Sequence, residues 1–485
     1  GLMHALFPAR RDVLFFGAFT SVGFACLPWV LLLKGQLLAN LLSFSLIPAA
    51  IALVIAYVHA GARRHWRGLL LCLALSVGFF GVAHPNGLFT VLVFLAPFVI
   101  HRIADAITQS TWIGSRNPLR KPWVVWILGL AFAYLVWQAM LYAPPLQQVV
   151  LFNNTGNLNL SWTESAYAAA VFSLYPEQPP QWALTLACAA GFVALVRQRR
   201  FWLGLPALYM LAVYGLCRCS DAPYTLRTFF AGFWYSDPTR IAGSLTIFLT
   251  PIVSLGVAML LRALVKVMSH VVSAEGPLTV GKGSQRAIIA LMLAALACYL
   301  YFPNFTPDIW DAEEVTKTPI GIVKQRIANE YDTEREQVYS TKEREFVQKA
   351  ASLIPEGSLV LNQPHDGSVF AYGLDGLNTY FRSAGTFGYS DTAETIRQGA
   401  DKIATDKDVQ DAVKSTGAEY LILLDQGVAY EDGKWLSTYY DSYVPFWDGL
   451  NKVTDETPGY ELILADGDMR LYKITATEDG EGSEG

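Results

Sequence analysis

Apolar residues are gathered into long, nearly uncharged runs over residues 1–303. A helix needs about 20 such residues to cross the hydrocarbon core of a bilayer, with a range of roughly 17–25. The pattern predicts nine membrane-spanning helices, at residues 13–33, 41–60, 68–83, 88–104, 122–142, 181–197, 201–217, 243–261 and 287–303. A tight turn that begins at His84 makes the short run 68–83 one arm of a hairpin with the run that follows.

After residue 303 the pattern changes to short segments with the periodicity of strands or of amphipathic helices. The predicted helices lie at 335–353, at 391–404 with Ser390 or Asp391 as the cap, and at 407–415. The predicted strands lie at Ser358–Asn362, Glu419–Asp425, Tyr460–Leu464 and Met469–Ile474, the last two forming a hairpin. Because helices alternate with strands, we expect a small α/β domain with a mixed sheet.

Charge divides the chain at the same place. Residues 1–303 carry 20 Lys and Arg against 7 Asp and Glu, whereas residues 304–485 carry 16 against 34. Cytoplasmic loops of membrane proteins are enriched in Lys and Arg. A cytoplasmic N-terminal end places sixteen basic residues of the first part inside and leaves four outside, namely Lys34, Arg218, Arg227 and Arg240. We therefore predict a cell-membrane protein whose acidic part is extracytoplasmic.

These patterns give a domain plan. We expect a transmembrane domain at 1–303, a connector at 304–334, an extracytoplasmic α/β domain at 335–476 and a disordered acidic tail at 477–485. The chain begins Gly-Leu, without an initiator Met or a signal-peptide pattern. We expect residue 1 to be an internal position of a longer protein.

The stretch Gly232–Gly243 concentrates polar and aromatic residues between two apolar runs. Trp234 and Tyr235 are of the types that settle at a membrane–water boundary, and Asp237 opens a turn with the following proline. Arg240 is of the type best suited to forked hydrogen bonds with a phosphate. The stretch can anchor a helix hairpin, with Asp237 and Arg240 paired on one helix face, or it can hold an anionic lipid headgroup. An outer loop at 143–180 adds a predicted surface helix at Ala166–Tyr175.

A second candidate site lies in the acidic part, at Gln363–Ser368. Polar residues just past the carboxyl end of a strand line the usual ligand crevice of an open α/β sheet. His365 is the only histidine of this part, and Asp366 is adjacent to it. The alternatives are a turn that starts the next element or a surface for domain docking.

Several function classes find no support in the sequence. There is no phosphate-binding loop, nucleophile elbow, zinc signature or nucleic-acid-binding module. Cys217 and Cys219 read as small apolar residues, and Asp466-Gly467-Asp468 reads as a turn before it reads as a metal site. We therefore identify no cofactor, find no support for a divalent metal, and expect no nucleic-acid partner. The uncharged spans count against a proton-coupled transporter.

Some motifs are similar to those of an uncharacterised family of multi-spanning actinobacterial membrane proteins, and the similarity covers most of residues 1–475. They are Leu27-Pro28-Trp29, Asn40-Leu41-Leu42-Ser43, His84-Pro85-Asn86, Trp234–Arg240, Asn362–Ser368 and Gly376–Arg382. The layout resembles the type-C membrane glycosyltransferases, which take sugars from polyprenyl-phosphate donors on the outer face. In those enzymes the catalytic Asp or Glu lies in the first outer loop, whereas Leu33–Asn40 contains Lys34 and no carboxylate.

The resemblance implies a glycosyltransferase-like protein of cell-envelope glycan assembly, with a membrane lipid or polyprenyl-phosphate-sugar as partner and with the catalytic residue unassigned. We expect a phosphate cavity lined by Arg240, Asp237 and His84, with Trp234 and Tyr235 against the sugar or isoprenoid. Arg227, His365 and Asp366 are expected to close it. A lipid or polysaccharide flippase and a non-catalytic envelope-assembly scaffold are the alternatives.

Overall fold

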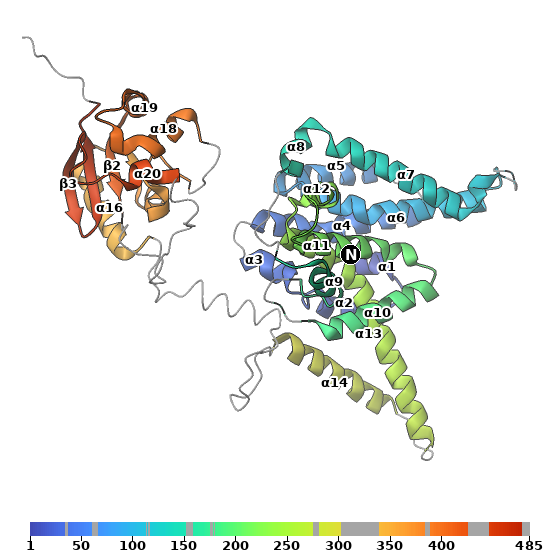
Figure 1. Ribbon diagram of the computed structural model, residues 1–485. Helices are drawn as coiled ribbons and strands as arrows, with labels where there is room; N and C mark the ends of the chain where they lie inside the picture. The colour runs from blue at the N-terminus through green and yellow to red at the C-terminus, as the bar shows by residue number, and fades with distance from the viewer. Residues whose placement is uncertain are drawn as a thin grey trace, which may run out of the picture. The chain divides into compact units, whose positions relative to one another are not determined.

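The computed structural model divides the chain into two compact units, Gly1–Glu330 and Tyr331–Gly485 (Figure 1). Each unit has hydrophobic clusters of its own. The structure describes residues 1–33, 37–60, 66–112, 114, 117–151, 159–174, 178, 180–274, 281–301, 339–383, 389–424 and 446–477. The predicted connector at 304–334 and nearly all of the predicted tail lie outside these ranges.

The described part of the first unit is helical, and six of its helical segments are long and apolar enough to cross a membrane. They are α4 (Leu38–Ala60), α5 (Trp66–Ala83), α6 (Asn86–Gln109), α7 (Pro122–Leu141), the segment Phe201–Arg218 that contains α11 (Leu205–Arg218), and α13 (Pro238–Ala274). Six of the nine predicted runs therefore form helices of spanning length and composition. The chain is a multi-helix protein of membrane type.

The other three predicted spans do not form long continuous apolar helices in the described residues. Within the run 13–33, α2 (Arg11–Thr20) ends before a turn, and a short π-helical segment, Cys26–Val30, follows. Leu27 there has an extended backbone, because the residue before a proline is disfavoured in the helical conformation. Helix α10 (Trp182–Arg197) has only 16 residues, and the apolar part of α14 (Lys282–Tyr301) is described at Arg286–Ala295. The prediction of nine spans is not confirmed.

Helix α13 packs against α10 at very short range. A Cβ atom at Gly191 on α10 would lie 2.0 Å from the Ile252 carbonyl oxygen, and one at Gly256 on α13 would lie 1.7 Å from the Ala187 carbonyl oxygen. Small residues at such positions let two backbones approach, which is a common way to pack helices in membranes. In another part of the unit, α6 packs between α4 and α7 (Figure 1).

The connections near the start of α13 contain three short helices, α8 (Pro144–Leu151), α9 (Trp162–Ala170) and α12 (Tyr224–Ala231). Helix α9 begins with a capping box in which Ser161 and Glu164 bond each other's backbone N–H groups. Helix α9 overlaps the predicted surface helix at Ala166–Tyr175, but it begins four residues earlier and ends five residues earlier. It packs on α11, with Ser165 and Ala168 buried.

The second unit is built on a four-stranded sheet of order β1-β2-β4-β3. The strands are β1 (Leu359–Asn362), β2 (Ala418–Leu423), β3 (Tyr460–Asp466) and β4 (Met469–Ile474). Strands β1 and β2 are parallel, while β4 is antiparallel to both of its neighbours, so the predicted mixed sheet is confirmed. The residues joining β3 to β4 form a tight turn with Gly467 in a left-handed conformation, as expected for an Asp-Gly hairpin.

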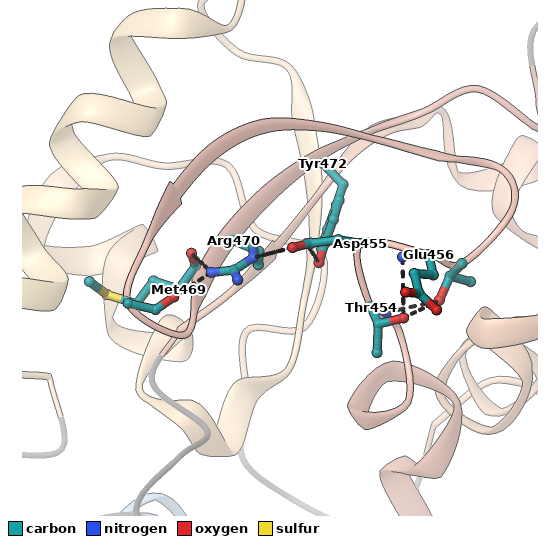
Figure 2. A network of polar contacts seen from close by, with 8 residues as sticks. Thr454, Asp455, Glu456, Met469, Arg470 and Tyr472 are labelled. Atoms are coloured by element: carbon teal, nitrogen blue, oxygen red, sulfur yellow. Dashed lines mark hydrogen bonds and ion pairs between the residues drawn. The ribbon is translucent and has the colours of Figure 1, made fainter.

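Helices cover both faces of this sheet (Figure 1). One face packs on α18 (Asp391–Gly399), α19 (Lys407–Thr416) and α20 (Asp448–Asn451), and the other on α16 (Thr341–Leu353) and α17 (Ala371–Asp375). The predicted cap of α18 is confirmed, because the Ser390 hydroxyl accepts the Ala393 N–H. On the last strand, Arg470 and Tyr472 both donate to the Asp455 carboxylate, which ties β4 to the turn before β3 (Figure 2).

Candidate functional site

The start of α13 is set by an unusual turn. Gly232–Trp234 forms one 3₁₀ turn, and Tyr235 and Ser236 then both adopt left-handed backbone conformations, with φ of 59° and 50°. Such conformations are uncommon for residues other than glycine, and they concentrate at functional sites. Pro238 starts α13, where its fixed φ suits the first helical turn.

Asp237 and Arg240 lie together at this helix start. Asp237 is buried and accepts the Thr239 N–H at 2.8 Å, so it caps α13. Its other carboxylate oxygen lies 3.5 Å from Arg240 Nε, an ion pair but not a hydrogen bond. Asp237 and Arg240 are therefore paired, as the structural alternative for their spacing of three allows.

Tyr235 and His84 complete what we call the Arg240 cluster, namely His84, Tyr235, Asp237 and Arg240. The Arg240 guanidinium lies over the Tyr235 ring at 4.2 Å from its centroid. The His84 ring packs edge-to-face on the same tyrosine, with centroids 5.6 Å apart. Burial and the nearby charge of Arg240 lower the pKa of His84 to about 4, so its imidazole is neutral at neutral pH.

Trp234 has a different role from the one expected. Its side chain is fully buried, and its indole N–H donates to Thr90 Oγ1 at 3.0 Å. That hydroxyl lies 3.0 Å from Ser244 Oγ, which joins α6 to α13. Trp234 therefore fixes the helix starts, while Tyr235 is the aromatic residue that contacts Arg240.

Two further arginines are buried near the same end of the bundle. Arg218 donates to Tyr214 and to Asn159, both at 3.1 Å. Arg227 is 7% exposed, and its Nε and Nη1 atoms have no hydrogen-bond partner in the described chain. Helix α12, which carries Arg227, packs on α11 and on the Gly232–Trp234 turn that leads into the Arg240 cluster.

The charge balance around this cluster is unequal. Asp237 is the one buried carboxylate among the described residues of the first unit, whereas Arg218, Arg227 and Arg240 are all buried or mostly buried, and Arg240 is its ion-pair partner. A buried charge is costly unless it is paired and hydrogen-bonded. The excess of positive charge therefore favours an anion at this place.

Sequence analysis assigned no role to two asparagines in the same neighbourhood. Asn40 and Asn86 are 1% and 0% exposed, and none of their side-chain nitrogen and oxygen atoms has a hydrogen-bond partner within the described ranges. Most buried polar atoms in proteins do have partners, so each exception calls for a ligand, a water or a functional role. Each lies just before a predicted apolar run, at 41–60 or 88–104, where a polar residue is ordinary, so no sequence feature marked them.

His365 and Asp366 belong to the second unit, at the carboxyl ends of β1 and β2. Asp366 accepts N–H groups from Ser368 and Leu424, and the His365 ring packs edge-to-face on Trp447. The Asn362 side chain donates to Ser368 and also exchanges hydrogen bonds with the Phe381 backbone. These polar groups bond one another in an internal network, which favours the structural interpretation of Gln363–Ser368.

Burial governs the titration of Asp366. It raises the pKa of this carboxyl to about 7, and it lowers the pKa of His365 to about 4. A carboxyl whose pKa is higher in the folded than in the unfolded state stabilises the fold at low pH, and this contribution is lost as the pH rises through the folded pKa.

We therefore expect Asp366 to reduce the free energy of unfolding of the second unit as the pH rises from about 4 to 7. Urea unfolding of residues 331–485 at several pH values measures this dependence. Asp366→Asn, which stays neutral, should lose this component of the slope even where it lowers stability overall. The exposed Asp411→Asn should keep the wild-type slope. Equal slopes in wild type and Asp366→Asn would contradict the assignment.

Among the described residues, no group of three or more His, Cys, Asp or Glu side chains is placed to hold a metal ion. Cys217 and Cys219 are both buried. Asp466 and Asp468 flank the hairpin turn between β3 and β4.

Comparison with known proteins gives one match. A model described as "Family of unknown function (DUF6541)" matches residues 1–476, which is nearly the whole chain. No curated protein and no solved structure matches it.

Proposed function

Because the chain belongs to the DUF6541 family, whose function is unknown, we propose its activity from the buried charges and the sequence resemblance. The protein is an integral membrane, type-C-like glycosyltransferase of cell-envelope glycan assembly. It takes a sugar from a polyprenyl-phosphate donor, whose phosphate binds between Arg227 and Arg240. In this proposal the Arg240 cluster lies on the outer face of the cell membrane, as the distribution of Lys and Arg predicts.

Arg227 is the observation that carries the proposal. It is a buried guanidinium with two nitrogen atoms that lack a hydrogen-bond partner among the described residues. Arginine forms forked, charge-assisted hydrogen bonds with phosphate oxygens. A lipid phosphate would supply acceptors to Arg227 and would balance the charge of Arg240, which Asp237 offsets only at 3.5 Å.

The proposed reaction places the arginines at the leaving group. The bond between the sugar C1 and the phosphate oxygen breaks, an acceptor hydroxyl forms the new bond to C1, and the polyprenyl phosphate leaves with an added negative charge. Positive groups that face charge developing in the transition state are an effective source of rate acceleration. Arg227 and Arg240 are suited to this role, while the base that takes the acceptor's proton stays unassigned.

We expect Arg227→Gln to weaken binding of a C55 polyprenyl phosphate to the full chain by about tenfold or more. A hydrogen bond to a charged group contributes about 1.5–3 kcal/mol, and 1.4 kcal/mol is a factor of ten. Titration of the purified protein in nanodiscs measures the affinity, with the uncharged C55 polyprenol as a second ligand that should be insensitive to the change.

The matched control is Arg197→Gln, which makes the same substitution at an exposed arginine that ends α10. It should bind the polyprenyl phosphate as the wild type does. If the wild type binds phosphate and polyprenol equally, or if Arg227→Gln matches Arg197→Gln, the phosphate site is wrong and a non-catalytic scaffold becomes the better interpretation.

A further inference from the structure

Three helix starts meet beside the Arg240 cluster, those of α4, α6 and α13. Ser43 Oγ on α4 donates to the His84 carbonyl at 2.9 Å, and His84 lies two residues before the first residue of α6. A Cβ atom at Gly243 on α13 would lie 2.9 Å from the Phe44 ring of α4. Thr90 on α6 and Ser244 on α13 are joined through their hydroxyls. The three helices are therefore in mutual contact within two turns of their first residues.

One helical turn earlier, each helix carries one polar residue. Asn40 precedes Phe44 by four positions, Asn86 precedes Thr90 by four, and Arg240 precedes Ser244 by four. Residues four apart lie on the same face of a helix, about one turn along its axis. Because Phe44, Thr90 and Ser244 lie at or beside the contacts between the three helices, the geometry points to Asn40, Asn86 and Arg240 facing the same region one turn nearer the helix starts. The contact of His84 with Tyr235 lies at this end as well.

The two amides need a partner of a particular kind. Each buried asparagine offers two N–H donors and one carbonyl acceptor, and all these atoms lack partners in the described residues. A phosphate can accept from the N–H groups, but it cannot donate to the amide carbonyls. Hydroxyl groups both donate and accept hydrogen bonds, so a polyol can pair with the amide carbonyls, which a phosphate alone would leave without a donor.

We propose that Asn40 and Asn86 form a sugar subsite beside the phosphate site, which binds hydroxyls of the single sugar carried by the lipid phosphate. This inference rests on the proposed function, because Arg240 holds the phosphate to which that sugar is attached. A site built to bond a hydroxyl rejects ligands that lack it, since its own buried polar groups are then left unpaired. The subsite therefore distinguishes a glycosylated donor from the bare lipid phosphate.

The test compares two probes on the full-length chain in nanodiscs, a C55 polyprenyl phosphate and the same lipid phosphate carrying one mannose or one glucose. The variants are Asn86→Leu and, on a different helix, Asn40→Leu, because leucine has a similar size and removes the amide. Replacing an unpartnered buried amide by an apolar group should leave the melting temperature equal or higher. The control is Ser45→Ala, at an exposed position of α4.

We expect each leucine variant to weaken binding of the sugar-bearing lipid at least tenfold and to leave binding of the bare lipid phosphate within twofold. Equal losses for both probes would show that the amides act on the phosphate site or on the fold. No loss for either probe would show that the amides hold only water. Either result overturns the sugar subsite while leaving the phosphate site in place. If the wild type does not bind the bare lipid phosphate, the proposed function fails, and the subsite fails with it.

Discussion

Gly256→Ala is expected to disrupt the packing of the first unit, although it adds one methyl group. The new Cβ would lie 1.7 Å from the Ala187 carbonyl oxygen and 2.7 Å from the Gly191 backbone nitrogen. Both neighbours are backbone atoms of α10, so no side-chain rotation relieves the clash and the two helices must separate. Overpacking of a core typically costs about 1–3 kcal/mol. We expect about 3 kcal/mol or more here, because the contact between α10 and α13 is lost along its length.

The measurement is the thermal midpoint of the full chain in detergent, together with the fraction that elutes as a single species. Gly78→Ala is the matched control, since it makes the same change in a helix of spanning length, where a Cβ meets nothing within 4 Å. Alanine has the higher helix propensity, so this control should be at least as stable as the wild type. A Gly256→Ala variant with the same melting temperature as Gly78→Ala would contradict the close packing of α10 on α13.

Most of the architecture could be predicted from local pattern. Long uncharged runs identified six helices of spanning length, because hydropathy and length are sufficient evidence for such helices. The run 13–33 is not confirmed as one continuous span, because α2 ends at Thr20 and the backbone is extended at Leu27, a break that mean hydropathy does not reveal. The sheet of the second unit was predictable from strand periodicity and from the Asp-Gly turn. The order β1-β2-β4-β3 was not, because pairing depends on contacts distant in sequence.

The candidate site was predictable only in part. The spacing of Asp237 and Arg240 allowed their pairing, and Tyr235, which the sequence analysis grouped with them, lies against the Arg240 guanidinium. The burial of Arg227 was not visible, since an arginine in a loop normally reads as exposed. Asn40 and Asn86 each precede a predicted apolar run, where a polar residue attracts no notice. That their side chains are buried without hydrogen-bond partners depends on how the helices pack in space, which the sequence does not show.

The ion pair between Asp237 and Arg240 lacks the hydrogen bond that a purely structural salt bridge would have. A salt bridge that served stability alone would gain from close, bidentate geometry. Asp237, however, accepts its hydrogen bond from the Thr239 N–H and none from Arg240 Nε. Arg240 keeps the Tyr235 face and a long contact with the carboxylate. This arrangement leaves guanidinium hydrogen-bonding capacity for a further anion, which is the basis of the last prediction.

Asp237→Asn is expected to destabilise the unliganded protein by about 3 kcal/mol, because it removes the carboxylate that is paired with the mostly buried Arg240. Breaking a buried ion pair by deleting one partner typically costs about 3–5 kcal/mol, and the partial exposure of Arg240 favours the lower end. Asparagine is itself a good helix cap, so the Thr239 N–H keeps an acceptor and the loss reports charge. Thermal unfolding of the full chain measures the effect.

A lipid phosphate should then reverse much of this loss. A ligand that binds only the folded state raises its stability in proportion to RT ln(1 + [L]/Kd), and removing the competing carboxylate should tighten binding of the phosphate to Arg240. We therefore expect a C55 polyprenyl phosphate to raise the melting temperature of Asp237→Asn more than that of the wild type. Asp221→Asn, at an exposed position between α11 and α12, should show neither the loss nor the added rescue. If Asp237→Asn and the wild type have the same melting temperature, and the lipid phosphate raises both temperatures equally, Asp237 is not the counter-ion that a bound phosphate replaces.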